Sequence, residues 1–172
     1  MTEPTNTKNL DRYGSAPLEW SRARDILVAD TPTADLTFFV STVRPDGRPH
    51  SAGVGAVWVE DALYFKAGPG TRRARNLAEN PACTVAVRLR GMDLTLEGEA
   101  GRVTDSATVE RVAVVYREGG WPATAEGATL TAPYSAPSAG APPWHLYRLA
   151  LHRAIGVASA EPHGATRWDF AT

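Results

Sequence analysis

Four basic side chains gather in a stretch of the chain that carries no acidic residue. Between Ala62 and Ala78 there are four cations and neither Asp nor Glu: Lys66, Arg72, Arg73 and Arg75. Three of them fall at the start of a predicted short helix, where unpaired N–H groups already place partial positive charge, so each arginine costs roughly a few tenths of a kcal/mol. A bound phosphate would compensate by accepting from those N–H groups, from the Thr71 hydroxyl and from the planar guanidinium groups of Arg72 and Arg73. The residue types therefore point to an anion site.

A second interpretation of the same stretch stays open. The helix can present a solvated basic face in which Arg75 pairs with Glu79, four residues later. Two standard phosphate motifs are excluded, because Gly68-Pro69-Gly70 is followed neither by the third glycine of a dinucleotide fingerprint nor by the Gly-Lys-Ser/Thr of a P-loop. The parallel βαβ units that carry those motifs are missing from the pattern. A phosphate bound here would therefore lie on an antiparallel scaffold.

The remaining candidate residues give weaker signals. No histidine has a metal-type partner three or four positions away, so we expect no metal site at His50, His145, His152 or His163. Cys83 is the single cysteine, which excludes an intramolecular disulfide, and its place at the start of an apolar strand predicts burial rather than nucleophilic chemistry. The sequence assigns no catalytic side chain.

The elements that must position these residues are mostly strands. Alternating apolar residues between turn signals predict strands over residues 36–43, 48–59, 63–67, 83–89, 93–103, 144–149 and 153–159. Apolar residues at helical spacing predict three short helices, over residues 17–29, over 72–79 and between a Thr104-Asp105-Ser106 cap and Gly119. Consecutive strands joined by tight turns make an antiparallel sheet, and six or seven of them close into a barrel, which removes open edges.

The composition is that of a globular domain. The chain has 172 residues, 43% of them hydrophobic, and its 18 Lys and Arg nearly balance 19 Asp and Glu. We expect one domain over residues 1–172 with one core, a flexible N-terminus over 1–16 and a long Pro/Ala-rich loop over 121–143. The balanced charge argues against a nucleic-acid partner, and no apolar run is long enough for a membrane helix. Because the start lacks a secretory signal, we expect a cytoplasmic protein.

Several motifs together resemble one family. In chain order they are Pro45-Asp46-Gly47-Arg48-Pro49-His50, Ala62-Leu63-Tyr64-Phe65, the stretch from Gly70 to Pro81, and Glu97-Gly98-Glu99-Ala100. In this ordered combination they resemble the pyridoxamine 5'-phosphate oxidase-like superfamily of flavin-binding split barrels. The resemblance covers residues 36–103, with weaker support from a Thr-Arg-Trp-x-Phe tail at 166–170.

The resemblance implies a fold and a cofactor. The fold is a homodimeric, antiparallel split β-barrel, mostly β with short helices, and the cofactor is FMN or the 8-hydroxy-5-deazaflavin coenzyme F420, held between subunits. The phosphate element of the family falls on Thr71, Arg72 and Arg73, in agreement with the charge argument. The strand that lies along the cofactor ring falls on Ser51, Ala52, Gly53 and Val54. The resemblance also implies that Lys66, Ala67 and Asn76 contact the cofactor, and that Trp168 contacts it from the tail of the neighbouring subunit.

Two of these assignments have alternatives. Gly53 and Gly55 leave one face of the strand over residues 48–59 bare, which suits the approach of a flat ring but equally suits a bend or bulge in a barrel. Trp168 and Phe170 can pin the tail to the core instead of covering a cofactor. Both interpretations of each feature stay open on the sequence.

The resemblance to the true oxidase is incomplete. That enzyme has an arginine at the position of Ala52, a lysine at that of Val57 and a glutamine at that of Asp93, and nothing here matches its C-terminal Arg-Leu-His-Asp-Arg element. We therefore do not expect pyridoxal phosphate synthesis. The resemblance implies an FMN- or F420-dependent oxidoreductase that transfers a hydride to or from a small organic substrate. The alternative is a non-catalytic flavin- or haem-binding sensor or storage protein on the same fold.

Overall fold

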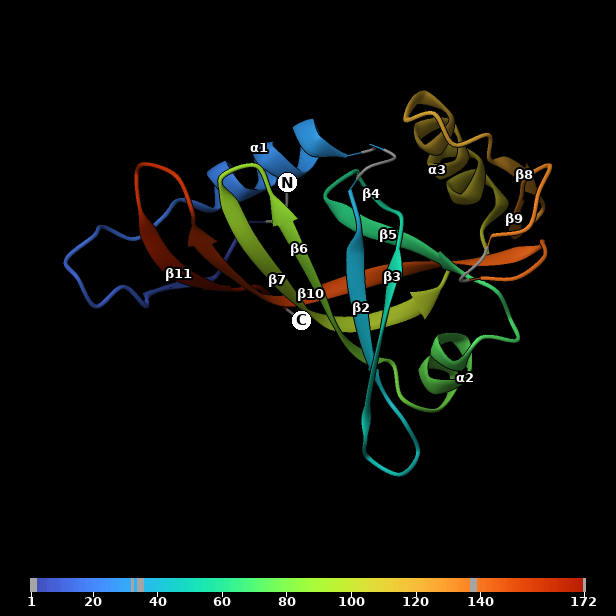
Figure 1. The fold of residues 1–172 in the computed structure, drawn as a ribbon, viewed down its shortest axis with the longest axis horizontal. Coiled ribbons are helices and arrows are strands. Elements are labelled where there is room, and N and C mark those ends of the chain that lie inside the picture. Colours follow the sequence, from blue (N-terminus) through green and yellow to red (C-terminus); the bar gives the residue numbers. More distant parts are fainter. Residues whose placement is uncertain (1–2, 32, 34–35, 137–138, 172) are drawn as a thin grey trace.

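Eleven antiparallel strands and three helices make up the part of the chain that the computed structural model describes, residues 3–31, 33, 36–136 and 139–171 (Figure 1). The strands are β1 Asn6–Asn9, β2 Phe38–Val43, β3 Pro49–Val54, β4 Ala56–Val59, β5 Ala62–Ala67, β6 Ala82–Leu89, β7 Met92–Arg102, β8 Thr124–Glu126, β9 Thr129–Thr131, β10 Trp144–Ala158 and β11 Gly164–Asp169. The helices are α1 Trp20–Asp30, α2 Arg72–Glu79 and α3 Ser106–Glu118. The predicted class, mostly antiparallel β with short helices, is confirmed.

Six strand pairings close on themselves and form the barrel. Hydrogen-bonded neighbours run from β3 through β2, β6, β7, β10 and β5 to β4. Because β3 and β4 are successive parts of one stretch of chain, the pairings return to their start. The ring is completed by the chain and not by hydrogen bonds, because β3 and β4 do not pair with each other, so among the described residues each keeps one unpaired edge. Beyond the ring, β11 pairs with the second half of β10, and β1 pairs with β11.

Two predicted strand boundaries are wrong, for the same reason. The predicted strand over residues 48–59 is divided at Gly55, since β3 pairs with β2 whereas β4 pairs with β5. This change of partner favours the bend among the alternatives for Gly55. The predicted strands over 144–149 and 153–159 are one strand, β10, whose register against β7 shifts between Leu151 and Arg153. Alternation shows that a segment is extended but not which neighbour it pairs with.

Two segments predicted to lack regular structure contain strands. β1, inside the N-terminal segment over residues 1–16, pairs along its length with β11. β8 and β9, inside the loop over 121–143, form a hairpin that joins β10 through the pair Trp144 and Leu130. Residues 1–2 and 137–138 of these two segments lie outside the described residues. Strands this short and polar show too little alternation to be recognised in a sequence.

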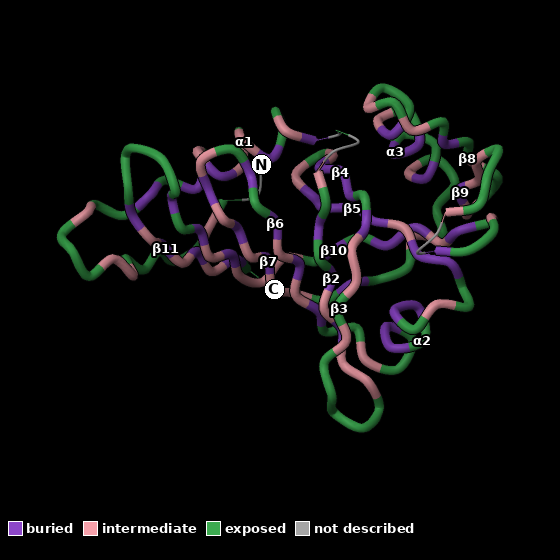
Figure 2. Tube along the Cα trace, viewed as in Figure 1, coloured by how far each residue is buried: buried purple, intermediate pink, exposed green. Residues whose placement is uncertain are grey.

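The barrel strands separate two apolar cores, where the sequence predicts one. Successive residues of β5 point to opposite faces, so Leu63 and Phe65 enter the first core, inside the barrel and under α1, while Tyr64 enters the second. The second core lies between the outer faces of β4 and β5, the helix α3 and the β8–β9 hairpin. Figure 2 shows buried stretches in the barrel strands and, separately, in α3.

The helices cover the barrel at different places (Figure 1). α2 begins and ends where the sequence predicts and lies against β2 and β3. α3 starts at Asp105, whose carboxylate accepts from the Thr108 N–H at 2.8 Å, and it buries the predicted stripe of Val109, Val112 and Tyr116. No helix of the described residues is long and apolar enough to cross a lipid bilayer.

Candidate functional site

The N-terminus of α2 has the geometry of an anion site. Thr71 is the N-cap residue: its hydroxyl accepts from the Ala74 N–H at 3.2 Å and donates to the Gly68 carbonyl at 2.8 Å. The first turn holds no acidic residue, and the first amides of any helix lack an intrahelical acceptor. The Thr71 hydroxyl is thus engaged within the loop, whereas the first-turn amides and the helix dipole favour a negative ligand.

The two arginines predicted to grip a phosphate differ in burial. Arg72 is exposed, but the Arg73 side chain is enclosed and the residue is only 2% exposed. The Nη2 of Arg73 donates to the Lys66 carbonyl at 3.4 Å, while Nε and Nη1 are buried and have no hydrogen-bond partner among the described residues. Burial lowers the pKa of Arg73, and the nearby phenols of Tyr147 and Tyr116 act in the opposite direction. The expected pair of surface contacts is therefore one exposed arginine and one buried cation.

Two more basic side chains lie beside Arg73, and sequence reasoning missed both. The pKa of His50 is lowered by burial and then by the charges of Arg44, Arg73 and Arg72, so these four groups share one neighbourhood. Within the described residues six buried side-chain atoms lack a hydrogen-bond partner, and five lie here: Arg44 Nε, His50 Nδ1, Arg73 Nε and Nη1, and Asn76 Oδ1. We call Arg44, His50, Arg72 and Arg73 the basic cluster. A concentration of unpaired buried polar atoms is a feature that native folds otherwise avoid.

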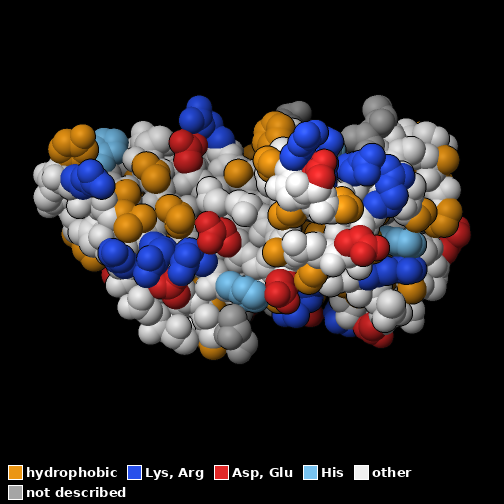
Figure 3. All heavy atoms as spheres, turned by 90° about the horizontal axis from the view of Figure 1, so that it is seen from below, with side chains coloured by type: hydrophobic (Ala, Val, Ile, Leu, Met, Phe, Trp, Pro, Cys, Tyr) orange, Lys and Arg blue, Asp and Glu red, His pale blue; other side chains and the backbone are white. Residues whose placement is uncertain are grey.

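The basic cluster is local. Figure 3 views the molecule from below Figure 1, the side on which α2 and the β2–β3 hairpin lie, and shows basic and acidic side chains interspersed over this face. The pairing of Thr42 with His50 across β2 and β3, together with a 2.9 Å hydrogen bond from Asn76 to the Thr42 hydroxyl, brings the hairpin to α2. This pairing is the signal that places His50 near the helix, and it emerges only once the hairpin register is known.

The strand predicted to lie along a cofactor ring is at an edge. Among the described residues β3 pairs with β2 alone, so the backbone groups of its other edge are not used in a ladder. Ser51 is exposed and accepts from the Ser41 hydroxyl at 3.1 Å, Ala52 and Gly53 are half-buried, and Val54 is buried. A Cβ on Gly53 would meet Thr37 Cγ2 at 3.0 Å. Packing within the protein therefore explains a glycine at this position without a cofactor ring.

Lys66 and Ala67 point in opposite directions from β5. Ala67 is fully buried in the barrel core. The Lys66 ammonium lies 3.7 Å from the centroid of the Trp121 ring and 5.3 Å from that of Tyr116, beside a cavity of about 300 Å³. Desolvation and, secondarily, the charge of Arg73 lower the pKa of Lys66 to about 8.

Two of the residues predicted to contact the cofactor are buried and hold elements of the fold together. Asn76 is 1% exposed, and its amide joins α2 to β2 through the Thr42 hydroxyl. Trp168 is 0% exposed: its indole N–H donates to the Leu18 carbonyl at 3.1 Å and its ring packs against Trp20 with centroids 5.4 Å apart. The tail is thus pinned to the core, and Trp168 has no exposed surface with which to cover a ligand.

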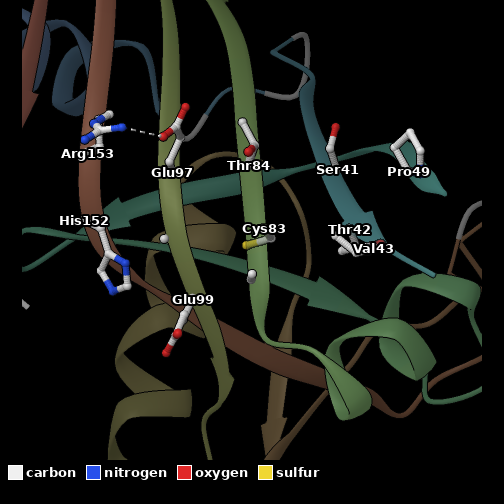
Figure 4. A pocket seen from close by; sticks show the side chains of 12 residues that line it. Ser41, Thr42, Val43, Pro49, Cys83, Thr84, Glu97, Glu99, His152 and Arg153 are labelled. Atoms are coloured by element: carbon white, nitrogen blue, oxygen red, sulfur yellow. Dashed lines mark ion pairs between the residues drawn. The ribbon is translucent and has the colours of Figure 1, made fainter. Parts of the chain in front are cut away.

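A wider groove of about 570 Å³ lies on the outer faces of β2, β6, β7 and β10 (Figure 4). In it Arg153 pairs with Glu97 at 3.7 Å, and Glu99 adds a second carboxylate. None of the residues predicted to contact the cofactor lines this groove. Its carboxylates would repel a phosphate, so we do not assign the groove to a phosphate-bearing ligand.

A family model agrees with the fold. Residues 28–157 match the model of pyridoxamine 5'-phosphate oxidase. The chain belongs to the pyridoxamine 5'-phosphate oxidase family. No curated protein matches the chain.

Several solved structures share the fold of this family member. A pyridoxamine 5'-phosphate oxidase-related, FMN-binding protein from Nostoc punctiforme is 16% identical with a TM-score of 0.57, over 88% of this chain and 90% of that one. A conserved hypothetical protein from Mycobacterium tuberculosis is 16% identical with a TM-score of 0.58, over 92% and 89%. A putative pyridoxamine 5'-phosphate oxidase from Listeria innocua is 15% identical with a TM-score of 0.54, over 78% and 94%. At these identities the likeness is one of fold.

This member of the pyridoxamine 5'-phosphate oxidase family departs from the oxidase itself at three positions, and none of the three residues lies at the start of α2. Val57 is fully buried in the second core, and Ala52 is half-buried on β3. Asp93 forms an exposed ion pair with Arg88 at 2.8 Å, next to the β6–β7 turn. None of the three presents a charged group to the start of α2. The charge there comes from the basic cluster.

Proposed function

We propose that this protein is an oxidoreductase that binds FMN or F420 by its phosphate at the start of α2 and transfers a hydride to or from a small organic substrate. The observation that carries the proposal is the Arg73 guanidinium, buried with two unpartnered nitrogens beside Arg44, His50 and Arg72. Burying an uncompensated charge is strongly unfavourable. An anion at the adjacent helix N-terminus compensates it, because charges in a region of low dielectric interact strongly.

Each part of the site has a role in this proposal. Arg72 and the first-turn amides of α2 donate hydrogen bonds to the phosphate, while Arg73 contributes its charge from behind the helix. The free edge of β3, over Ser51–Val54, offers backbone groups to the ring. The bound cofactor supplies the hydride chemistry, so the chain itself needs no acid–base pair. That the related Nostoc punctiforme protein is described as FMN-binding supports a flavin-type cofactor.

We also propose that the working form is a homodimer in which a second copy covers the ring. The edge strand β3 leaves one side of the ring position unenclosed by the described residues. The neighbouring strand β2 presents Phe39 with 53% of its surface exposed, and a large exposed apolar side chain next to a free edge suits an interface. Light scattering tests this part: we expect twice the chain mass, and a monomer at micromolar concentration would contradict it.

The visible spectrum of the purified protein, with and without added FMN, F420 or haem, tests the proposed function. We expect saturable binding of FMN or F420, and oxidation or reduction of the bound cofactor by a small organic substrate. A Soret band would instead indicate the haem-binding alternative. Binding without any redox turnover would indicate a flavin carrier or sensor, and binding of none of the three would contradict the proposal.

A matched pair of arginine variants tests the site. Arg72→Ala removes a charge-assisted hydrogen bond, each of which contributes roughly 1.5–3 kcal/mol, so we expect cofactor affinity to fall by about tenfold or more. Arg12→Ala removes an exposed arginine from the segment between β1 and α1, which Figure 1 places far from α2. Its affinity should equal that of the unmodified protein. Equal affinities in both variants would count against the start of α2 as the phosphate site.

A further inference from the structure

The cavity beside Lys66 is distinct from the basic cluster and has a chemistry of its own. It lies between β4, β5 and the C-terminal end of α3, and it is bounded by Leu36, Val57, Lys66, Tyr116, Trp121 and Tyr134 among other residues. Gly55, which separates β3 from β4, forms part of its wall and is held by a hydrogen bond from the Tyr116 hydroxyl to the Gly55 carbonyl at 3.1 Å. The cavity therefore begins where the proposed ring strand ends.

Among the residues that the structure describes, the Lys66 ammonium has no anionic partner. No described residue forms a hydrogen bond or an ion pair with its Nζ, and no Asp or Glu is among the described residues that line the cavity. The rings of Trp121 and Tyr116 are its neighbours, and the faces of such rings attract a cation. The ammonium thus lies against two aromatic rings at the cavity wall, and the described part of the chain offers it no hydrogen-bond acceptor.

Apolar and aromatic side chains form much of the remaining wall, and Thr33 and Thr37 add two hydroxyl groups. Leu36, Ala56 and Val57 line it with the aromatic rings. The volume of about 300 Å³ lies at the small end of the range of about 300–1,000 Å³ that is usual for ligand sites. An apolar body of a single ring fits this space, and one negative group on that body would meet Lys66. A free phosphate would leave the apolar wall without a partner.

We propose that this cavity binds a small organic carboxylate with an apolar body, and that the carboxylate pairs with the Lys66 ammonium while the body packs on Val57 and the aromatic rings. The binding site stands on the geometry alone. Naming its ligand as the substrate class rests on the proposed function, because the cavity adjoins the end of β3, along which the proposed cofactor ring lies. In that arrangement Lys66 orients the substrate by its carboxylate and the ring receives or delivers the hydride.

Calorimetric titration of the full-length protein with benzoate and with benzamide tests the proposal. The two probes have the same ring, and only benzoate carries a charge. We expect benzoate to bind at least about tenfold more tightly than benzamide, and Lys66→Met to remove this difference. Lys8→Met is the matched control, since Lys8 is the chain's other lysine and is exposed on β1. Equal binding of the two probes, or an unchanged preference in Lys66→Met, would overturn the proposal.

A second measurement keeps the test valid if Lys66→Met fails to fold. Reductive methylation of the unmodified protein, followed by peptide mass spectrometry, reports Lys66 and Lys8 separately because the chain has two lysines. We expect saturating benzoate to slow the modification of Lys66 by about fivefold or more, because bound benzoate protects the amine in proportion to the occupied fraction of the site. The modification rate of Lys8 should not change. Equal rates with and without benzoate would overturn the proposal.

The outcomes separate this inference from the proposed function. If benzoate binds at Lys66 but neither FMN nor F420 binds the protein, the carboxylate site stands and the oxidoreductase proposal fails. If a flavin-type cofactor binds and benzoate shows no charge preference, the oxidoreductase proposal stands and the carboxylate site fails.

Discussion

Replacing Arg73 with methionine should make the cofactor-free protein more stable and its cofactor binding weaker. Arg73 is 2% exposed with Nε and Nη1 unpartnered, and replacing buried charged groups by apolar ones of similar volume often stabilises a protein by roughly 1–4 kcal/mol. Losing the 3.4 Å hydrogen bond from Nη2 to the Lys66 carbonyl lowers the stability by about 1 kcal/mol. The net gain is roughly 0–3 kcal/mol. For a chain of this size each kcal/mol raises Tm by about 2–4 °C.

Differential scanning calorimetry of the apo-protein and a fluorescence titration with FMN measure the two effects. At the middle of this range, a gain of about 1.5 kcal/mol, we expect Tm to rise by about 3–6 °C, and we expect the FMN affinity to fall by about tenfold or more. Arg75→Met is the matched control on the same helix, because Arg75 is exposed and donates to the Gly70 carbonyl at 2.8 Å. It should not raise Tm. A clear fall in Tm for Arg73→Met would show that the apo-protein itself satisfies this charge, and an unchanged affinity would show that the charge does not serve the cofactor.

Three further predictions concern neighbouring elements. The pKa of Lys66 is lowered from 10.5 to about 8, so between these pH values the unfolded chain binds more protons than the folded chain. The free energy of unfolding of the wild type, compared with that of Lys66→Met, should therefore rise from about pH 8 to about pH 10. Urea denaturation measures both free energies. A constant difference would contradict the burial of this amine. Trp168→Phe should lower the free energy of unfolding by about 1–3 kcal/mol, because the Leu18 carbonyl loses its partner, while FMN affinity stays the same; a weakened FMN affinity would return Trp168 to the cofactor site. Thr71→Ala should lower the free energy of unfolding by about 1 kcal/mol, and Thr71→Ser should not, since the hydroxyl caps α2. Thermal denaturation measures this effect, and an unchanged Tm in Thr71→Ala would contradict the capping role.

Much of the fold could be predicted from local patterns. The boundaries of α2 follow from its N-cap and from the Asn80-Pro81 stop, and most barrel strands follow from alternation between turns. What failed was pairing. A chain that changes partner strand at Gly55 looks in the sequence like one strand, and a strand with a bulge after Leu151 looks like two. The reason is that the partner strands are far away in sequence.

The sequence points to the start of α2 as the candidate site but does not show which of its side chains are buried. Adjacent residues on a helix point about 100° apart, so Arg72 is exposed while Arg73 is buried behind the helix. The spacing of Arg73, Asn76 and Leu77 is that of a buried stripe, and this signal was available in the sequence. His50 could not be predicted, because its proximity to α2 depends on the register of the hairpin and on the docking of the helix.

The central claim is that the basic cluster holds the phosphate of a flavin-type cofactor. Comparing the dissociation constants of FMN and riboflavin tests it most directly, because the two differ by the phosphate alone; for F420 the phosphate-free deazaflavin serves the same purpose. The hydrogen bond of Arg72 and the charge of Arg73, with an effect of about tenfold each, predict that the phosphate-bearing form binds about a hundredfold more tightly or better, and that Arg72→Ala with Arg73→Met removes most of this preference. Equal affinities for FMN and riboflavin, or a preference that survives the double substitution, would contradict the account.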